Sequence, residues 1–176
     1  NFLPLVFFRP VYDLRCGVLS LRQKIESLLP AGLVSLHIRH ELAGCLKKDL
    51  PSRFINAIPA KDTWFINGRL LADDGIAKLL RSPLSEPKVF SCGSEIVAAF
   101  IGGDAVDAMF RTPVMPLDES AFNGIPSEQI SATLVHYPWD IVEHTSIEIE
   151  KDTRRVVRNS LRKTNPAIVY PGSHLL

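Results

Sequence analysis

Four cations surround a single glycine in the stretch FFRPVYDLRCGVLSLRQK, residues 7–24. Arg9, Arg15 and Lys24 flank Gly17 and a loop that leads into a helix N-terminus, where free backbone amides and the helix dipole favour an anion. Arginine adds bidentate donation to phosphate, and lysine adds a mobile charge. A charge-assisted hydrogen bond contributes about 1.5–3 kcal/mol, whereas micromolar affinity requires about 8 kcal/mol. A bound nucleotide phosphate would therefore also need a base or sugar pocket, and a magnesium ion on its phosphates.

The alternative for the same stretch is an ordinary charged helix face. Arg22 and Lys24 would then point to solvent instead of to a ligand. The pattern favours a surface position for Arg22 and leaves both interpretations open for Lys24.

A second group of candidates lies in TWFINGRLLADDGIAKLL, residues 63–80. The end of an apolar strand is where an open α/β sheet usually places ligand contacts, so Asn67 and Gly68 are candidate binding residues. Asn-Gly is equally typical of a simple turn. Asp73 and Asp74 fit helix caps better than metal ligands.

A third cluster is HYPWDIVEH, residues 136–144. Its side chains His136, Asp140, Glu143 and His144 suit metal or acid–base chemistry, but their spacing matches no metal signature. The alternative without a functional role is an ion pair or hydrogen bond between Asp140 and His144, which are i, i+4 neighbours on a helix.

The segment RRVVRNSLRK, residues 154–163, is strongly basic. A basic helix face can bind nucleic acid. Because no aromatic residues are interleaved and no recognition motif is present, the pattern favours a solvated or interdomain surface, and nucleic acid is not an expected partner.

Helical and strand-like patterns alternate along the chain and must position these candidates. Helical spacing runs from Val18 to Leu29 and is ended by Pro30, and Pro138 opens a long helix. Strands alternating with helices predict an α/β domain with a mainly parallel sheet. The other expected helices are residues 41–50, 73–80 and 104–110; the expected strands are 33–38, 54–58, 63–67, 130–137 and two around Gly93 within 88–101; residues 112–126 are an expected loop.

Composition sets the broad class. The 176 residues carry a net charge of +1, so a cationic site must be local. Three cysteines without CxxC spacing predict a reduced, cytoplasmic setting, and no apolar run is long enough to span a membrane. The chain starts at Asn1 within an apolar segment and stops as another begins, so we expect it to be incomplete at both ends.

Three segments in this order, LPLVFFRPVYDLRCGVLSLRQK, WFINGRLL and PWDIVEH, resemble the sugar nucleotidyltransferase-like proteins, whose N-terminal domain is similar to that of N-acetylglucosamine-1-phosphate uridylyltransferase. The resemblance covers nearly the whole chain. It implies a Rossmann-like nucleotide-diphospho-sugar transferase domain over residues 1–163, with residues 164–176 leading toward a left-handed parallel β-helix through which the protein could form a homo-oligomer.

The activity implied by the resemblance joins a nucleoside triphosphate to a sugar 1-phosphate and releases pyrophosphate with the help of magnesium. Such a reaction needs positioning and cations more than a covalent nucleophile. On the same basis Arg15 and Lys24 are the expected catalytic residues, and the expected substrate-binding residues are Arg9, Gly17, Asn67, Gly68 and Asp140.

The chain departs from this pattern at one strand end. Active enzymes of the superfamily carry Gly-Asp there, and the aspartate binds magnesium, whereas this sequence has Gly68-Arg69. The alternative function is therefore a catalytically degenerate domain that binds a nucleotide sugar, or serves assembly, beside a β-helix acyltransferase.

Overall fold

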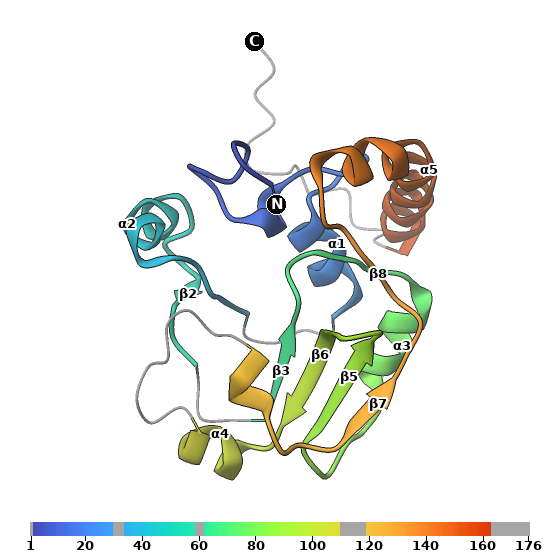
Figure 1. Ribbon diagram of the computed structural model, residues 1–176. Helices are drawn as coiled ribbons and strands as arrows, with labels where there is room; N and C mark the ends of the chain where they lie inside the picture. The colour runs from blue at the N-terminus through green and yellow to red at the C-terminus, as the bar shows by residue number, and fades with distance from the viewer. Residues whose placement is uncertain (1, 30–33, 59–61, 110–118, 163–176) are drawn as a thin grey trace.

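A four-stranded sheet forms the centre of the computed structural model, which describes residues 2–29, 34–58, 62–109 and 119–162 (Figure 1). Its strand order is β3-β6-β5-β7. Strands β5 and β6 form a hairpin that turns at Gly93. Strand β3 pairs antiparallel with β6, and β7 pairs parallel with β5. The strands are β3 (Thr63–Ile66), β5 (Lys88–Cys92), β6 (Glu95–Ile101) and β7 (Ser127–Gln129).

Both faces of this sheet are covered by apolar side chains. Trp64, Ile66 and Val97 pack in a core with α1 (Leu21–Leu28) and α3 (Asp74–Arg81). The alternate residues, such as Phe65 and Ala99, pack in a second core with α4 (Gly103–Met109) and the 3-10 helix η2 (Glu119–Phe122). The period of two along a strand accounts for this division, and burial on both faces accounts for the nearly continuous apolar run of β6.

The helices of the first core begin at residues that satisfy their free amides. Ser20 accepts a hydrogen bond from the amide of Gln23, whose side chain accepts one from the Ser20 amide, and this capping box fixes the start of α1. Asp73 accepts from the amide of Ile76 at 2.9 Å and caps α3. The predicted cap of α3 is confirmed, and α1 begins later than Val18 because Ser20 takes the N-cap position.

A smaller unit lies on the β3 side of the sheet (Figure 1). It consists of a parallel pair, β1 (Ser35–Leu36) with β2 (Phe54–Ile55), and helix α2 (His40–Asp49). Asn56, just after β2, ties the ends of the two strands together. Its side chain accepts a hydrogen bond from the amide of Ile38, just after β1, at 2.8 Å and donates one to the Ile38 carbonyl at 3.0 Å.

Helix α5 (Pro138–Arg162) starts at Pro138 as predicted and lies near α1 in Figure 1. It follows β8 (Thr133–Leu134), which pairs antiparallel with β4 (Leu70–Leu71). The carboxylate of Asp140 accepts the amides of His136 at 2.7 Å and Tyr137 at 2.9 Å, which closes the first turn.

The mixed α/β class is confirmed, but a mainly parallel sheet is not. The largest sheet has two antiparallel pairings and one parallel pairing. The predicted hairpin at Gly93 accounts for one antiparallel pairing, because a short turn forces its strands to run antiparallel, and β3 pairs antiparallel with β6 across a longer stretch of chain. Phe110 and the predicted division at residues 163/164 lie outside the described ranges. Among the described helices, none combines the length and apolar character that crossing a bilayer requires.

Candidate functional site

Two adjoining pockets form between the N-terminal segment, the loop after β1 and the turn after β3. The larger, of about 380 Å³, has three arginines in its wall and is named here the arginine pocket. No aspartate or glutamate is among its described lining residues. These are Phe2, Val6, Arg9, Pro10, Val11, Tyr12, His37, Ile38, Arg39, Gly68 and Arg69.

The second pocket, of about 230 Å³, is named the apolar pocket. Trp64, Phe65 and Ile66 of β3 contribute to it, together with apolar residues of α1 and β1. Tyr12, His37 and Gly68 line both pockets, so the two adjoin. The remaining lining is Arg22, Ile25, Glu26, Leu29, Val34, Ser35 and Leu36. The pair combines a cationic half with an apolar half, which suits a ligand with an anionic end and a flat apolar end.

The three arginines differ in how they are held. Arg39 donates to the backbone carbonyls of Val6 and Phe7, and so fixes the N-terminal segment. Arg69 forms an ion pair of 2.6 Å with Glu95. Arg9 is exposed and has no hydrogen bond or ion pair within the described part of the chain. Arg9 is therefore the cation best able to contact an incoming anion.

Two residues that line both pockets, Tyr12 and His37, each have one buried polar atom without a hydrogen-bond partner among the described residues. Tyr12 Oη and His37 Nδ1 are buried and make no hydrogen bond to the residues that the structure describes. Leaving such an atom unpaired costs about 1–3 kcal/mol. Buried polar groups are nearly always paired, so these two atoms are exceptions. Both are shielded from solvent, and neither is accessible from the pockets in this arrangement.

The ring of Tyr12 is held in place by the turn after β3. A Cβ placed on Gly68 would lie 3.1 Å from Tyr12 Cδ1 and 3.2 Å from Tyr12 Cβ, so only glycine leaves the ring undisturbed. Burial, followed by the charge of Asp13, raises the pKa of Tyr12, and burial lowers the pKa of His37. Both side chains are therefore uncharged at neutral pH.

Lys24, an expected catalytic residue, is fully buried and turned away from these pockets. Its ammonium lies 2.6 Å from both carboxylate oxygens of Asp152 and 2.8 Å from Glu148 Oε2. Burial opposes ionisation of Glu148, but hydrogen bonds from Lys151 and Lys24 outweigh it and lower the pKa of Glu148. The interpretation of Lys24 as facing either solvent or a bound anion is therefore wrong, because both α5 carboxylates already neutralise its charge.

Gly17 belongs to the same buried arrangement. With φ at +84°, it approaches α5 so closely that a Cβ would lie 2.9 Å from Asp152 Oδ2 and 2.9 Å from the backbone carbon of Glu148. Asp152 also accepts the amides of Val18 and Leu19 at 3.0 Å each. This loop therefore binds a carboxylate of the protein itself. We name Lys24, Glu148 and Asp152 the Lys24 cluster.

The other expected residues divide between the pockets and the framework. Arg15 is exposed, donates to the Val18 carbonyl at 3.3 Å and lines neither pocket. The Asn67 side chain donates to the Ile96 carbonyl at 2.8 Å and accepts the Arg69 amide at 3.0 Å, so it shapes the turn. The carboxylate of Asp140 serves the first turn of α5, and the amide of His136 is the main cause of its lowered pKa.

The structure thus brings Arg9 and Gly68 together at the pockets, and it adds Tyr12, His37, Arg39 and Arg69. Sequence reasoning missed these four side chains. One signal was present: Arg69 follows β3 within three residues, and His37 directly follows β1. Polar residues just after the carboxyl end of a strand are typical of ligand contacts in α/β folds, and here the two strands belong to different sheets.

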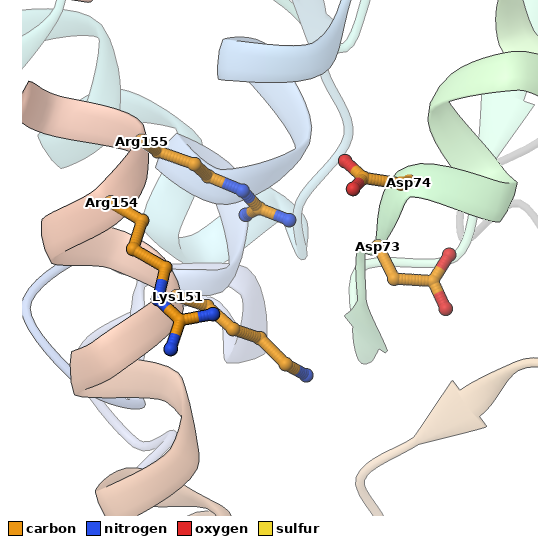
Figure 2. A pocket seen from close by; sticks show the side chains of 5 residues that line it. All are labelled: Asp73, Asp74, Lys151, Arg154 and Arg155. Carbon is orange, nitrogen blue, oxygen red and sulfur yellow. The ribbon is translucent and has the colours of Figure 1, made fainter. Parts of the chain in front are cut away.

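A third pocket, of about 250 Å³, lies between α5 and the start of α3. Figure 2 shows Lys151 and Arg155 pointing from α5 toward the side where Asp73 and Asp74 lie. Arg155 donates to the Ala72 carbonyl at 2.8 Å, and Asp73 caps α3. These contacts tie the two helices together, and the mixed charges do not single out an anionic ligand.

Magnesium, expected from the resemblance, would need oxygen ligands at this site. Within residues 2–29, 34–58, 62–109 and 119–162, no group of three or more His, Cys, Asp or Glu side chains could hold a metal ion. Arginines line the larger pocket where oxygen ligands would be required. Magnesium usually binds through one or two carboxylates and the substrate's phosphates, so its participation stays a prediction.

Comparison with known proteins identifies the family. The model of the sugar nucleotidyl transferase family matches residues 1–160. The chain therefore belongs to this family, and the predicted resemblance is confirmed. Neither the curated proteins nor the solved structures contain a significant match.

Proposed function

We propose that the chain joins a nucleoside triphosphate to a sugar 1-phosphate at the paired pockets and releases pyrophosphate. Family membership supports nucleotidyl transfer in general. The observation that carries the location is the cationic pocket beside an apolar one, with Arg9 open to a ligand. Phosphates fit the arginine side, and the nucleoside fits the apolar side.

In the proposed reaction an oxygen of the sugar phosphate attacks the α-phosphorus of the triphosphate. A new P–O bond forms, the bond from the α-phosphorus to the bridging oxygen breaks, and the electron pair leaves with pyrophosphate. Arg9 would contact the phosphates directly, while Arg39 and Arg69 add positive charge beside them. Their contribution would be alignment and neutralisation of negative charge as it develops, since phosphoryl-type transfer depends mainly on these two effects.

The contact with Arg9 is too weak to account for binding alone. One charge-assisted hydrogen bond would supply about 1.5–3 kcal/mol, against about 8 kcal/mol for micromolar affinity. The charge of Arg39 and Arg69 and contacts in the apolar pocket would have to supply the rest. Magnesium enters the proposal only as a companion of the triphosphate, and no step is assigned to a protein-bound ion.

A second candidate function is binding of a nucleotide sugar without turnover. The observation that favours it is the Lys24 cluster, in which an expected catalytic lysine is buried against two carboxylates. The lack of carboxylates among the described residues of the arginine pocket points the same way. A homo-oligomer formed through a downstream β-helix, a cytoplasmic location and the role of Arg15 all stay predictions.

The test is a pyrophosphate-release assay on the full-length protein with magnesium, the four ribonucleoside triphosphates and a panel of sugar 1-phosphates. We expect release for at least one pairing and its loss in Arg9→Ala. The matched control is Arg154→Ala, which removes an arginine that is 82% exposed and outside the paired pockets. Binding of a nucleotide sugar by calorimetry with no release for any pairing would support the second candidate and refute turnover.

A further inference from the structure

Three ionisable side chains from separate parts of the sequence meet beside the arginine pocket. Arg69 Nη2 lies 2.6 Å from Glu95 Oε1, and His136 Nε2 lies 2.5 Å from Glu95 Oε2. Arg69 lies between β3 and β4, Glu95 begins β6, and His136 lies between β8 and α5. We name these three side chains the Glu95 bridge. Of the three, only Arg69 lines the arginine pocket, so Glu95 and His136 act on a ligand there through Arg69 and through their charge.

The carboxylate of Glu95 has a partner on each of its oxygens. Hydrogen bonds from His136 and then Arg69 lower the pKa of Glu95, so it stays ionised at neutral and at mildly acidic pH. The His136 ring can donate from Nε2 both as a neutral imidazole and as an imidazolium. The contact with Glu95 therefore does not have to break when the ring gains a proton.

The charge of the Glu95 bridge depends on this ring. While His136 is neutral, the charges of Arg69 and Glu95 cancel. When His136 is protonated, the bridge carries one net positive charge. An imidazole changes charge within the range of about pH 5 to 8, and the His136 side chain is 44% exposed, so protons reach it directly from solvent.

The other titratable groups to consider are Asp140, His144 and His37. Asp140 accepts the His136 amide at 2.7 Å, and its pKa is lowered mainly by that hydrogen bond, so it stays negative. His144 interacts with Asp140 electrostatically but contacts no member of the Glu95 bridge among the described residues. His37 lines the arginine pocket, but burial lowers its pKa and favours its neutral form.

We propose that His136 is a positioning residue of the arginine pocket: its protonation draws Glu95 away from Arg69 electrostatically and couples the binding of phosphate to the uptake of a proton. Because the coupling is reciprocal, affinity for a phosphate anion rises as the pH falls through the range in which the ring gains its proton. The inference adds regulation to the proposed function. It rests on that function only in that the arginine pocket binds phosphate.

The test measures the affinity of the full-length protein for inorganic triphosphate by calorimetry at about pH 7.5 and about pH 5.5, toward either end of the imidazole range. His136→Gln keeps a hydrogen-bond donor for Glu95 but cannot gain a proton. On going to the lower pH, the unmodified protein should gain about two- to fivefold in affinity relative to His136→Gln, as for one unit charge acting over roughly a Debye length. The triphosphate itself titrates equally with both proteins, so this difference isolates His136.

A second variant separates charge from shape. His136→Lys is positively charged at both pH values, so at about pH 7.5 it should bind triphosphate about two- to fivefold more tightly than the unmodified protein. A purely structural role of His136 predicts no such gain. Calorimetry in two buffers of different ionisation enthalpy should also show that both variants take up fewer protons on binding. His144→Gln is the matched control and should keep the full pH dependence.

The outcomes distinguish the inference from the function on which it rests. If inorganic triphosphate does not bind the unmodified protein, both fail. If it binds and Arg9→Ala weakens binding, but His136→Gln shows the pH dependence of the unmodified protein, the role of His136 is wrong while the proposed function stands. Loss of the pH dependence in His144→Gln, or weaker binding by His136→Lys at an unchanged melting temperature, also overturns it.

Discussion

Arg9 and Lys24 belong to the same N-terminal block, yet they occupy opposite environments. The Lys24 ammonium is fully buried and contacts two carboxylates at 2.6 and 2.8 Å. Arg9 is exposed at the rim of the arginine pocket and has no ion-pair partner among residues 2–29, 34–58, 62–109 and 119–162. One cation is satisfied by the protein, and the other is available to a ligand.

The difference shows that a cation's function depends on where the matching anion comes from. The loop around Gly17 does bind a carboxylate through its amides, but that carboxylate is Asp152 of α5. A glycine, basic residues and a helix start can therefore form a structural contact between two helices that has the same local features as a phosphate site. The arginine pocket differs from this loop because it contains Arg9, an exposed cation without a hydrogen bond or ion pair to the described residues.

Replacing Lys24 should have the largest effect on stability. Lys24→Met leaves Asp152 buried without its counter-charge and leaves Glu148 with Lys151 alone, and breaking a buried pair costs about 3–5 kcal/mol. That is a large share of the roughly 5–15 kcal/mol by which domains are stable. Urea denaturation monitored by circular dichroism would measure the change in the free energy of unfolding. Lys48→Met, on the exposed face of α2, is the control and should change stability by less than about 0.5 kcal/mol. A stable Lys24→Met protein that had lost nucleotide affinity would restore Lys24 as a ligand contact.

Gly17→Ala should be the next most damaging change, since it combines an unfavourable φ with a steric overlap. Gly124 provides the matched control, because its φ of +85° nearly equals the +84° of Gly17 and a Cβ added there would have no described atom within 4 Å. We expect about 1–2 kcal/mol of destabilisation for Gly124→Ala from conformation alone. Gly17→Ala should cost about 1–3 kcal/mol more from overlap with α5. Equal losses in thermal unfolding would show that the loop does not depend on its close approach to α5.

Replacing Arg9 tests whether the exposed cation serves ligand binding and not stability. Arg9→Ala should weaken binding of a nucleoside triphosphate by roughly tenfold to a hundredfold, which corresponds to one lost charge-assisted hydrogen bond of about 1.5–3 kcal/mol. Stability should stay within about 0.5 kcal/mol, because Arg9 makes no hydrogen bond or ion pair with the described residues. Calorimetry and denaturation of the same preparation measure both quantities. If Arg154→Ala weakened binding equally, the effect would be a general loss of positive charge.

Much of the fold follows from local patterns. The cap at Asp73, the hairpin at Gly93 and the helix start at Pro138 were predictable because each depends on a few adjacent residues. The sheet was mispredicted because strand direction depends on pairings between distant segments, such as β3 with β6. An alternation of helices and strands does not specify those pairings.

The site was less predictable for the same reason. Lys24 meets Asp152 across 128 residues, and no local pattern indicates that contact. Tyr12 and His37 become neighbours of Gly68 only when η1, the loop after β1 and the turn after β3 come together. Arg9 and Gly68, which were proposed from the N-terminal loop and a strand end as well as from the resemblance, do line the arginine pocket, and their roles stay predictions.

The smallest expected effect concerns Glu95, which links the arginine pocket to the framework. Glu95 pairs with His136 at 2.5 Å and with Arg69 at 2.6 Å, and the hydrogen bonds from His136 and then Arg69 lower the pKa of Glu95. Because the pKa in the folded protein lies below that in the unfolded chain, the stabilisation is complete above about pH 4.3. It is lost as the pH falls through the folded pKa.

Glu95→Gln should therefore cost at most about 1 kcal/mol at pH 7, since Glu95 is partly exposed and solvent screens the pair. The difference from the unmodified protein should shrink as the pH is lowered below about 4 in a series of urea denaturations. Glu128→Gln, which breaks the more exposed pair with Lys88, is the control and should show a smaller pH-dependent change.

Glu95→Gln also sharpens the comparison between exposed and paired cations. It releases Arg69 from its ion pair, so that Arg69 resembles Arg9, and affinity for inorganic triphosphate should rise. An unchanged affinity would mean that Arg69 contributes to the wall of the pocket and not to the binding of phosphate.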